Sequence, residues 1–183
     1  MPLRIFLIIS ALAFFASHSY AAALPPFPQG DGSITFYNYH TGEVLDVSYR
    51  AGQKYNKNGI KKIQHIFRSR SDDLEHKIEL NLIDLLDNIQ DHFKADAIEL
   101  ISGYRSPELN KQLKAEGQNV SEQSLHMEGK AADIHIDEIS EGEIVIQRRI
   151  LSMSMWESCA IGICLISRAG SCWVFKRGAS GRF

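Results

Sequence analysis

The chain has 183 residues, a length typical of a single domain. Its 20 Lys and Arg nearly balance its 22 Asp and Glu, and the net charge of −2 argues against a protein that binds nucleic acid through bulk charge. Hydrophobic residues make up 44% of the chain, which indicates a globular protein rather than a disordered one, and three cysteines are too few for a disulfide scaffold.

The first 23 residues have the pattern of a secretory signal peptide. Arg4 and the α-amino group give a positive start, residues 5–15 form a nearly unbroken apolar run, and residues 19–21 fit the small-x-small rule before a cleavage point. The apolar run is shorter than the ~20 residues that a membrane-spanning helix needs. We therefore expect cleavage, export to the periplasm or cell envelope, and no transmembrane segment afterwards. Residues 24–32, rich in Pro and Gly, are predicted to form a linker.

A β-hairpin and two helices are predicted next. Residues 34–39 and 44–49 are β-rich segments separated by a turn. Residues 56–68 carry apolar side chains at helical spacing, and residues 78–93 form a stronger amphipathic pattern. We assign the apolar stripe of that second helix to the core; it consists of Ile78, Leu82, Leu85, Leu86, Ile89 and Phe93.

Short strands and one more helix follow. Residues 97–101 and 130–137 are predicted strands, and Ser106 caps a helix that begins with Pro107 and ends before Gly117. Helices are mixed with short strands without regular βαβ alternation, which is typical of the α+β class. We expect one compact domain over residues 33–155, with a small antiparallel sheet and flanking helices.

His126 and Asp133 are the first candidates for a chemical role, because imidazole and carboxylate are both good zinc ligands. Seven residues of extended strand would separate them by more than about 20 Å. They can share one ion only if the chain turns between them, and Gly129 suits such a turn because glycine adopts positive φ without penalty. From the spacing alone, an ordinary loop histidine and a strand-end carboxylate remain the stronger interpretation.

Two motifs, which occur one after the other in the chain, favour zinc binding over that interpretation. SGYRSPELNKQLK (residues 102–114) and SLHMEGKAADIHI (residues 124–136) resemble the family of zinc D-alanyl-D-alanine carboxypeptidases and murein endopeptidases. The second contains Ser-x-His-x-x-Gly-x-Ala-x-Asp with every fixed position present. The hairpin sequence ITFYNYHTGEVLDVSY (residues 34–49) narrows the resemblance to the murein endopeptidase K-like group of exported cell-wall enzymes.

This resemblance implies an α+β fold around one catalytic zinc ion and hydrolysis of peptide bonds in peptidoglycan stems, in the closest group between two meso-diaminopimelate residues. His126 and Asp133 match two zinc ligands, and Arg105 matches the arginine placed near the scissile carbonyl. Zinc would lower the pKa of its bound water towards about 7, and Arg105 could stabilise the oxyanion. We expect an exported zinc metallopeptidase of cell-wall remodelling that acts on peptidoglycan peptide stems as a monomer, with no nucleic-acid partner.

The sequence departs from the family pattern near its end. The family takes its third zinc ligand from a histidine in a late strand, and no histidine follows His135. All three cysteines and both tryptophans lie in residues 156–183, which we interpret as an atypical tail. A shifted reading frame is one interpretation, because residues 170–173 can be encoded by codons that give Val-His-Val when read one nucleotide further on.

Several alternatives remain open at this point. His135 lies two residues beyond Asp133 on the same strand face and could replace the missing ligand. Cys159 and Cys164 could form a disulfide, while the spacing of the three cysteines fits no common zinc pattern. Without a third ligand the chain would be a catalytically degenerate member of the family, which binds peptidoglycan without cutting it.

Overall fold

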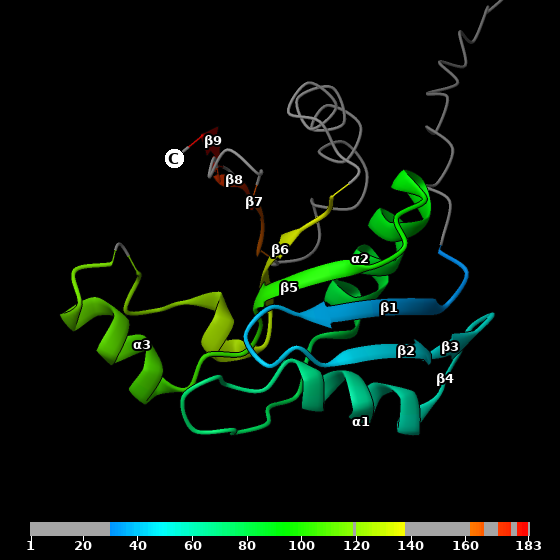
Figure 1. The fold of residues 1–183 in the computed structure, drawn as a ribbon, viewed down its shortest axis with the longest axis horizontal. Coiled ribbons are helices and arrows are strands. Elements are labelled where there is room, and N and C mark those ends of the chain that lie inside the picture. Colours follow the sequence, from blue (N-terminus) through cyan, green and yellow to red (C-terminus); the bar gives the residue numbers. More distant parts are fainter. Residues whose placement is uncertain (1–29, 119, 138–161, 167–171, 177–178, 183) are drawn as a thin grey trace, which may run out of the picture.

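The structure is a computed structural model of the chain, and it describes residues 30–118, 120–137, 162–166, 172–176 and 179–182. The elements in these ranges are β1 (Ser33–Asn38), β2 (Val44–Ser48), β3 (Arg50–Ala51), β4 (Lys54–Tyr55), α1 (Lys57–Ile66), α2 (Leu80–Phe93), β5 (Ile98–Ser102), α3 (Pro107–Ala115), the 3-10 turn η1 (Leu125–Glu128), β6 (Ala131–His135), β7 (Gly162–Ile166), β8 (Cys172–Lys176) and β9 (Ala179–Arg182). Helix α3 projects from one end of the sheet (Figure 1). None of the helices in these ranges has the length and apolar character needed to traverse a bilayer.

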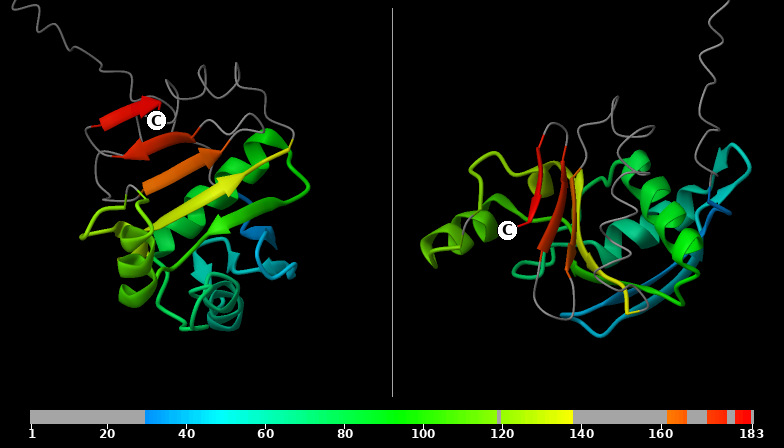
Figure 2. Two further views of the ribbon diagram at one scale, coloured as in Figure 1. Left: turned by 60° about the vertical axis from the view of Figure 1, so that its left-hand side comes forward. Right: turned by 90° about the horizontal axis from the view of Figure 1, so that it is seen from above.

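Seven strands form one sheet in the order β2-β1-β5-β6-β7-β8-β9, which can be followed in Figure 2. β1 runs parallel to β5 and β6 runs parallel to β7, while the other neighbouring pairs are antiparallel. The predicted α+β class is confirmed, but the sheet is mixed rather than antiparallel. The β1–β5 pair is parallel because β2, α1 and α2 lie between these strands and return the chain to the end where β1 began.

Helices α1 and α2 form where the spacing predicts them, and both bury their apolar faces. The side-chain oxygen of Asn56 accepts two backbone N–H groups of the first turn and so caps α1. Of the predicted stripe, Ile78 lies just before α2 and is buried, as are the α2 residues Leu82, Leu85, Leu86 and Ile89, while Phe93 is partly buried. Phe36 of β1 and Phe67 after α1 meet edge to face, with ring centroids 5.1 Å apart. The helices and the sheet therefore share one core.

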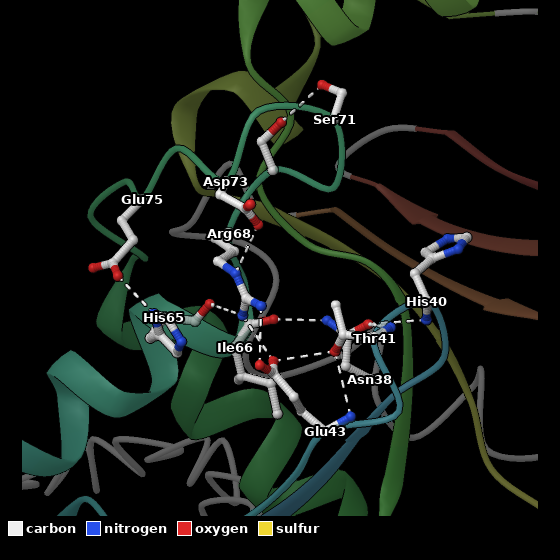
Figure 3. A network of polar contacts seen from close by, with 11 residues as sticks. Asn38, His40, Thr41, Glu43, His65, Ile66, Arg68, Ser71, Asp73 and Glu75 are labelled. Carbon is white, nitrogen blue, oxygen red and sulfur yellow. Dashed lines mark hydrogen bonds and ion pairs between the residues drawn. The ribbon is translucent and has the colours of Figure 1, made fainter.

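A polar network joins the β1–β2 turn to the segment that follows α1 (Figure 3). Arg68 donates to both carboxylate oxygens of Glu43, at 2.7 and 2.9 Å. Asn38 donates to the carbonyl oxygen of Ile66 at 2.9 Å and accepts from the backbone N–H of His40 at 2.9 Å. The network fixes the turn that carries His40.

The other predicted elements match the structure closely, and the differences lie in short or late segments. The predicted hairpin is β1 and β2, the predicted strands are β5 and β6, and the predicted third helix is α3, whose cap Ser106 accepts the backbone N–H of Leu109 at 3.1 Å. The short strands β3 and β4 were not predicted, and neither were β7, β8 and β9, which fall in the proposed tail. The predicted signal peptide and most of the predicted linker lie outside the described residues.

Candidate metal centre

The loop that follows β5 carries Arg105 and is fixed against neighbouring segments. Gly103 lies so close to Phe67 that an added Cβ would be 2.7 Å from its carbonyl oxygen, so a larger residue does not fit. The backbone N–H of Tyr104 donates to the same carbonyl at 2.7 Å. The Tyr104 ring also stacks on His76, with centroids 4.7 Å apart. The loop is therefore held on two sides before the chain reaches Arg105.

A β-bulge at the end of β5 brings Ser102 opposite Asp133. The register between β5 and β6 shifts between Leu100 and Ser102, so one residue of β5 is left over. The hydroxyl oxygen of Ser102 then accepts a hydrogen bond from Nε of Arg105 at 3.0 Å. The bulge therefore sets the position of Arg105 relative to Asp133.

The turn η1 presents His126. The hydroxyl of Ser124 accepts the backbone N–H of His126 at 3.4 Å and caps the turn. Gly129 ends it with φ 64°, where an added Cβ would lie 2.1 Å from the carbonyl oxygen of Lys77. The turn predicted at this glycine is confirmed, and it reverses the chain so that β6 brings Asp133 back to His126.

His126 and Asp133 face each other at a separation that fits a metal ion. Nε2 of His126 lies 3.4 Å from Oδ1 of Asp133, and two atoms bound to a tetrahedral zinc ion at about 2.0–2.1 Å lie about 3.3–3.4 Å apart. Nδ1 of His126 is 2.8 Å from the carbonyl oxygen of Gly103, which only accepts, so the ring proton of the neutral imidazole lies on Nδ1. In this neutral form Nε2 carries a lone pair on the side of the carboxylate, which is the form of the imidazole that can bind a metal ion.

Arg105 binds the second oxygen of Asp133. Its Nη2 lies 2.5 Å from Oδ2, which leaves Oδ1 directed at His126. The Nε of Arg105 is engaged by Ser102, so three of the five guanidinium N–H groups have no protein partner within the described residues. These groups remain available to a bound molecule.

The charges and hydrogen bonds around Asp133 favour its ionised form. Burial raises the pKa of Asp133, but contact with His126 and the charge of Arg105 outweigh burial and hold that pKa below its usual range. Burial lowers the pKa of Arg105, the charge of Asp133 raises it, and the nearby charge of Arg70 lowers it again. Asp133 is therefore an ionised carboxylate, which is the form that binds a metal.

Within the described residues, the His126–Asp133 pair has no third protein ligand. His135, the alternative considered from the sequence, directs its Nε2 to Oδ1 of Asp137 at 3.1 Å. It does not form a three-ligand group with the pair. The one group of three potential ligands in the described part of the chain lies elsewhere, with ligand atoms within 4.8 Å of one another, and consists of Asp31, Asp87 and Asp91.

That acidic group offers oxygen atoms alone, which suit calcium or magnesium rather than zinc. Its buried member, Asp87, already accepts hydrogen bonds from Tyr49 and Arg50 at 2.8 and 3.0 Å. Asp91 accepts the backbone N–H of Asp31 at 2.8 Å. These contacts give the carboxylates of Asp87 and Asp91 a structural role in holding residues 30–32 and Tyr49 against α2.

Cys164 lies beside Asp133 in the parallel register between β6 and β7. It is buried and disulfide-bonded. A sulfur atom in a disulfide is not a thiolate, so Cys164 offers no ligand to the neighbouring pair.

Comparison with known proteins identifies the family. The sequence profile described as peptidoglycan L,D-endopeptidase MepK matches residues 29–156. The chain belongs to this family. The proteins named peptidoglycan L,D-endopeptidase MepK in Escherichia coli (strain K12) and in Shigella flexneri are each 31% identical to it over 142 residues, which is 77% of this chain and 75% of each relative. A probable peptidoglycan L,D-endopeptidase MepK of Haemophilus influenzae is 31% identical over 105 residues, or 56% of each chain. No solved structure was found that matches the chain.

Membership of the MepK family confirms the resemblance seen in the sequence, and with it the expectation of a peptidase. Arg105, His126 and Asp133, the candidate residues of this MepK relative, lie together in the structure. The sequence did not indicate the role of Gly103, whose carbonyl orients His126. Any residue type supplies a backbone carbonyl, so the one signal that could have pointed to Gly103 was its place in the Ser-Gly-Tyr-Arg motif.

Proposed function

We propose that this chain is an exported zinc metallopeptidase that hydrolyses peptide cross-links of peptidoglycan. The observation that carries the proposal is the 3.4 Å separation of His126 Nε2 and Asp133 Oδ1, with Nδ1 of the same ring held by the carbonyl oxygen of Gly103. That donor set suits zinc, which binds imidazole and carboxylate ligands in catalytic sites. The relatives carry the name peptidoglycan L,D-endopeptidase, which supports peptidoglycan stem peptides as the substrate.

In this proposal His126 and Asp133 hold the zinc ion, which when bound supplies Lewis acidity and a water of lowered pKa, about 7. The carbonyl of Gly103 fixes the tautomer of His126, so that Nε2 is the ligand atom. Arg105 binds Oδ2 of Asp133, so that Oδ1 is the second ligand atom. The unpartnered N–H groups of Arg105 then stabilise the oxyanion that forms on the scissile carbonyl.

The proposed location follows from the sequence and the substrate. The pattern of residues 1–23 is that of a secretory signal, and peptidoglycan lies outside the cytoplasmic membrane. The protein would act in the periplasm or cell envelope, as a monomer.

One observation favours a second candidate function. Within the described residues the pair has two ligands, whereas a catalytic zinc ion commonly has three protein ligands and an open position. A chain with only two would be a degenerate family member that binds peptidoglycan stems without cutting them.

Zinc analysis and cell-wall digestion separate these functions. We expect purified wild-type protein to contain about one zinc ion per chain and to release peptides from purified peptidoglycan. The His126→Ala variant should lose both properties, while His65→Ala, which changes an exposed histidine of α1, should keep both. Zinc-free wild-type protein that binds peptidoglycan and releases nothing would establish the degenerate function instead. Loss of zinc in the His135→Ala variant would show that His135 is the third zinc ligand after all.

A further inference from the structure

Arg70, in the segment after α1, stands out among the arginines whose side chains the structure describes. Arg50, Arg68 and Arg105 each form an ion pair with at least one carboxylate. Arg70 forms none within the described residues, and its Nη1 instead donates to Nε2 of His40 at 2.9 Å. None of the described carboxylates therefore neutralises its positive charge.

His40 holds Arg70 in place by accepting a hydrogen bond, and it supplies no negative charge to neutralise the guanidinium. A guanidinium only donates, so Nε2 of His40 must be the unprotonated nitrogen. Burial lowers the pKa of His40, the charge of Arg70 lowers it further, and a hydrogen bond to the backbone of Ile101 opposes both. His40 is itself fixed by Asn38, as Figure 3 shows, and packs edge to face on Tyr39 with centroids 5.4 Å apart.

The Arg70–His40 pair lines a small pocket beside the candidate metal centre. Ser102, Gly103 and Tyr104 line the same pocket, and these residues position Arg105 and His126. The pocket is partly open to solvent and has a volume of about 20 Å³, enough for one group the size of a water molecule or a carboxylate oxygen. Asp73, the acidic residue of the wall, is bound by Arg68 at 3.1 Å and does not neutralise Arg70.

We propose that Arg70, positioned by His40, binds a free carboxylate of the peptide substrate next to the scissile bond. The inference rests on the proposed function, and it names the feature of the substrate that this face recognises. A guanidinium matches a carboxylate in shape and charge, and binds it more strongly than an uncharged amide. Stem peptides that contain meso-diaminopimelate carry such a carboxylate on the side chain of that residue. The enzyme would therefore prefer stems in which this group is free over stems in which it is amidated.

The test compares two probes: a stem peptide ending in meso-diaminopimelate, and the same peptide with the side-chain carboxylate amidated. Calorimetry with the full chain gives a Kd for each, and this readout needs no turnover. We expect the wild type to bind the acid about tenfold more tightly than the amide. Arg70→Gln, which can still donate to His40, should bring the ratio close to one by weakening acid binding alone. Arg70→Lys should keep part of the preference.

Lys62→Gln is the matched control, because it removes one exposed positive charge from α1, away from this pocket. It should leave the ratio of the two Kd values unchanged. A wild type without preference, or an Arg70→Gln variant with the wild-type ratio, overturns the inference. If the ratio responds to Arg70 while cross-linked peptidoglycan is not cut, the carboxylate site stands and the proposed hydrolysis fails.

Discussion

The side chain of Arg105 can have two separate roles in the candidate site. It binds Oδ2 of Asp133, which positions a proposed zinc ligand, and it keeps three N–H groups that no protein group within the described residues uses. The first role concerns metal binding and the second concerns the transition state, so the two can be separated by measurement.

For Arg105→Gln we expect kcat on a cross-linked muropeptide to fall about 10²–10³-fold, the usual effect of removing an oxyanion donor. Zinc content should stay near that of the wild type, because Gln can still donate a hydrogen bond to Asp133. Metal analysis and steady-state kinetics on the same samples test this. A parallel loss of zinc and of activity would show that Arg105 acts by positioning Asp133 alone.

The candidate residues and the turn between His126 and Asp133 could be predicted from the sequence, whereas the contacts that position these side chains could not. His126 and Asp133 are candidates because of their residue types and the family motif, and the glycine and small residues between them permit the turn that lets them meet. The Gly103 carbonyl and the bulge before Ser102 depend on how β5 meets β6, which pairs residues more than 30 positions apart. Local sequence does not encode such a register.

Gly129 provides a test of the turn that brings the ligands together. Gly129→Ala places a Cβ at φ 64° and 2.1 Å from the carbonyl oxygen of Lys77. Gly42→Ala has a similar φ of 70° but open space around the added Cβ, so it serves as the matched control. We expect Gly42→Ala to lower the free energy of unfolding by about 1 kcal/mol and Gly129→Ala by at least about 3 kcal/mol. Urea denaturation measures both, and equal losses would contradict the crowding at Gly129.

At the scale of single elements, the helices were the most predictable part of the fold. α1 and α3 have side-chain caps at Asn56 and Ser106, and α2 has a long apolar stripe, so each carries its own signal. β3, β4 and η1 are too short to show a period, and they form because of the contacts around them. The β1–β2 turn is a similar case, because its position depends on Arg68, which approaches from the end of α1.

The Arg68–Glu43 ion pair predicts a pH-dependent stability. Hydrogen bonding from Arg68 lowers the pKa of Glu43 in the folded chain, so the pair contributes stability above the unfolded pKa and loses it as pH falls through the folded one. Glu43 is 40% exposed, and solvent screening limits the contribution to about 0.5–1 kcal/mol. Glu43→Gln should therefore lower the free energy of unfolding by that amount at pH 7 and by less at pH 3.

Denaturation curves at the two pH values provide the measurement. Asp96→Asn is the control, because Asp96 lies in a turn and has no ion pair within the described residues. An equal effect of Glu43→Gln at both pH values would show that the carboxylate charge does not matter.

At the scale of the whole molecule, the sheet combines strands that were predicted from the sequence with strands that were not. The predicted strands are β1, β2, β5 and β6, and the others are β7, β8 and β9. β7 pairs with β6 along four residues, beside Asp133, and continues into β8 and β9. The proposed tail therefore supplies neighbours to the strand that carries Asp133. Because β6 lies between β5 and β7, it is an interior strand of the sheet and has no free edge.

Ile163 tests whether this late strand is part of the cooperative fold. It is 1% exposed and belongs to the main core, so Ile163→Ala should lower the free energy of unfolding by about 2–4 kcal/mol through lost burial and a residual cavity. Val44→Ala, at a side chain that is 69% exposed on β2, should change it by less than about 0.5 kcal/mol. Chemical denaturation followed by both far-ultraviolet circular dichroism and tryptophan fluorescence is informative, because both tryptophans, Trp156 and Trp173, lie in residues 156–183. If Ile163→Ala behaves like Val44→Ala, β7 does not contribute to the folded state, and the strand bearing Asp133 would then be an edge.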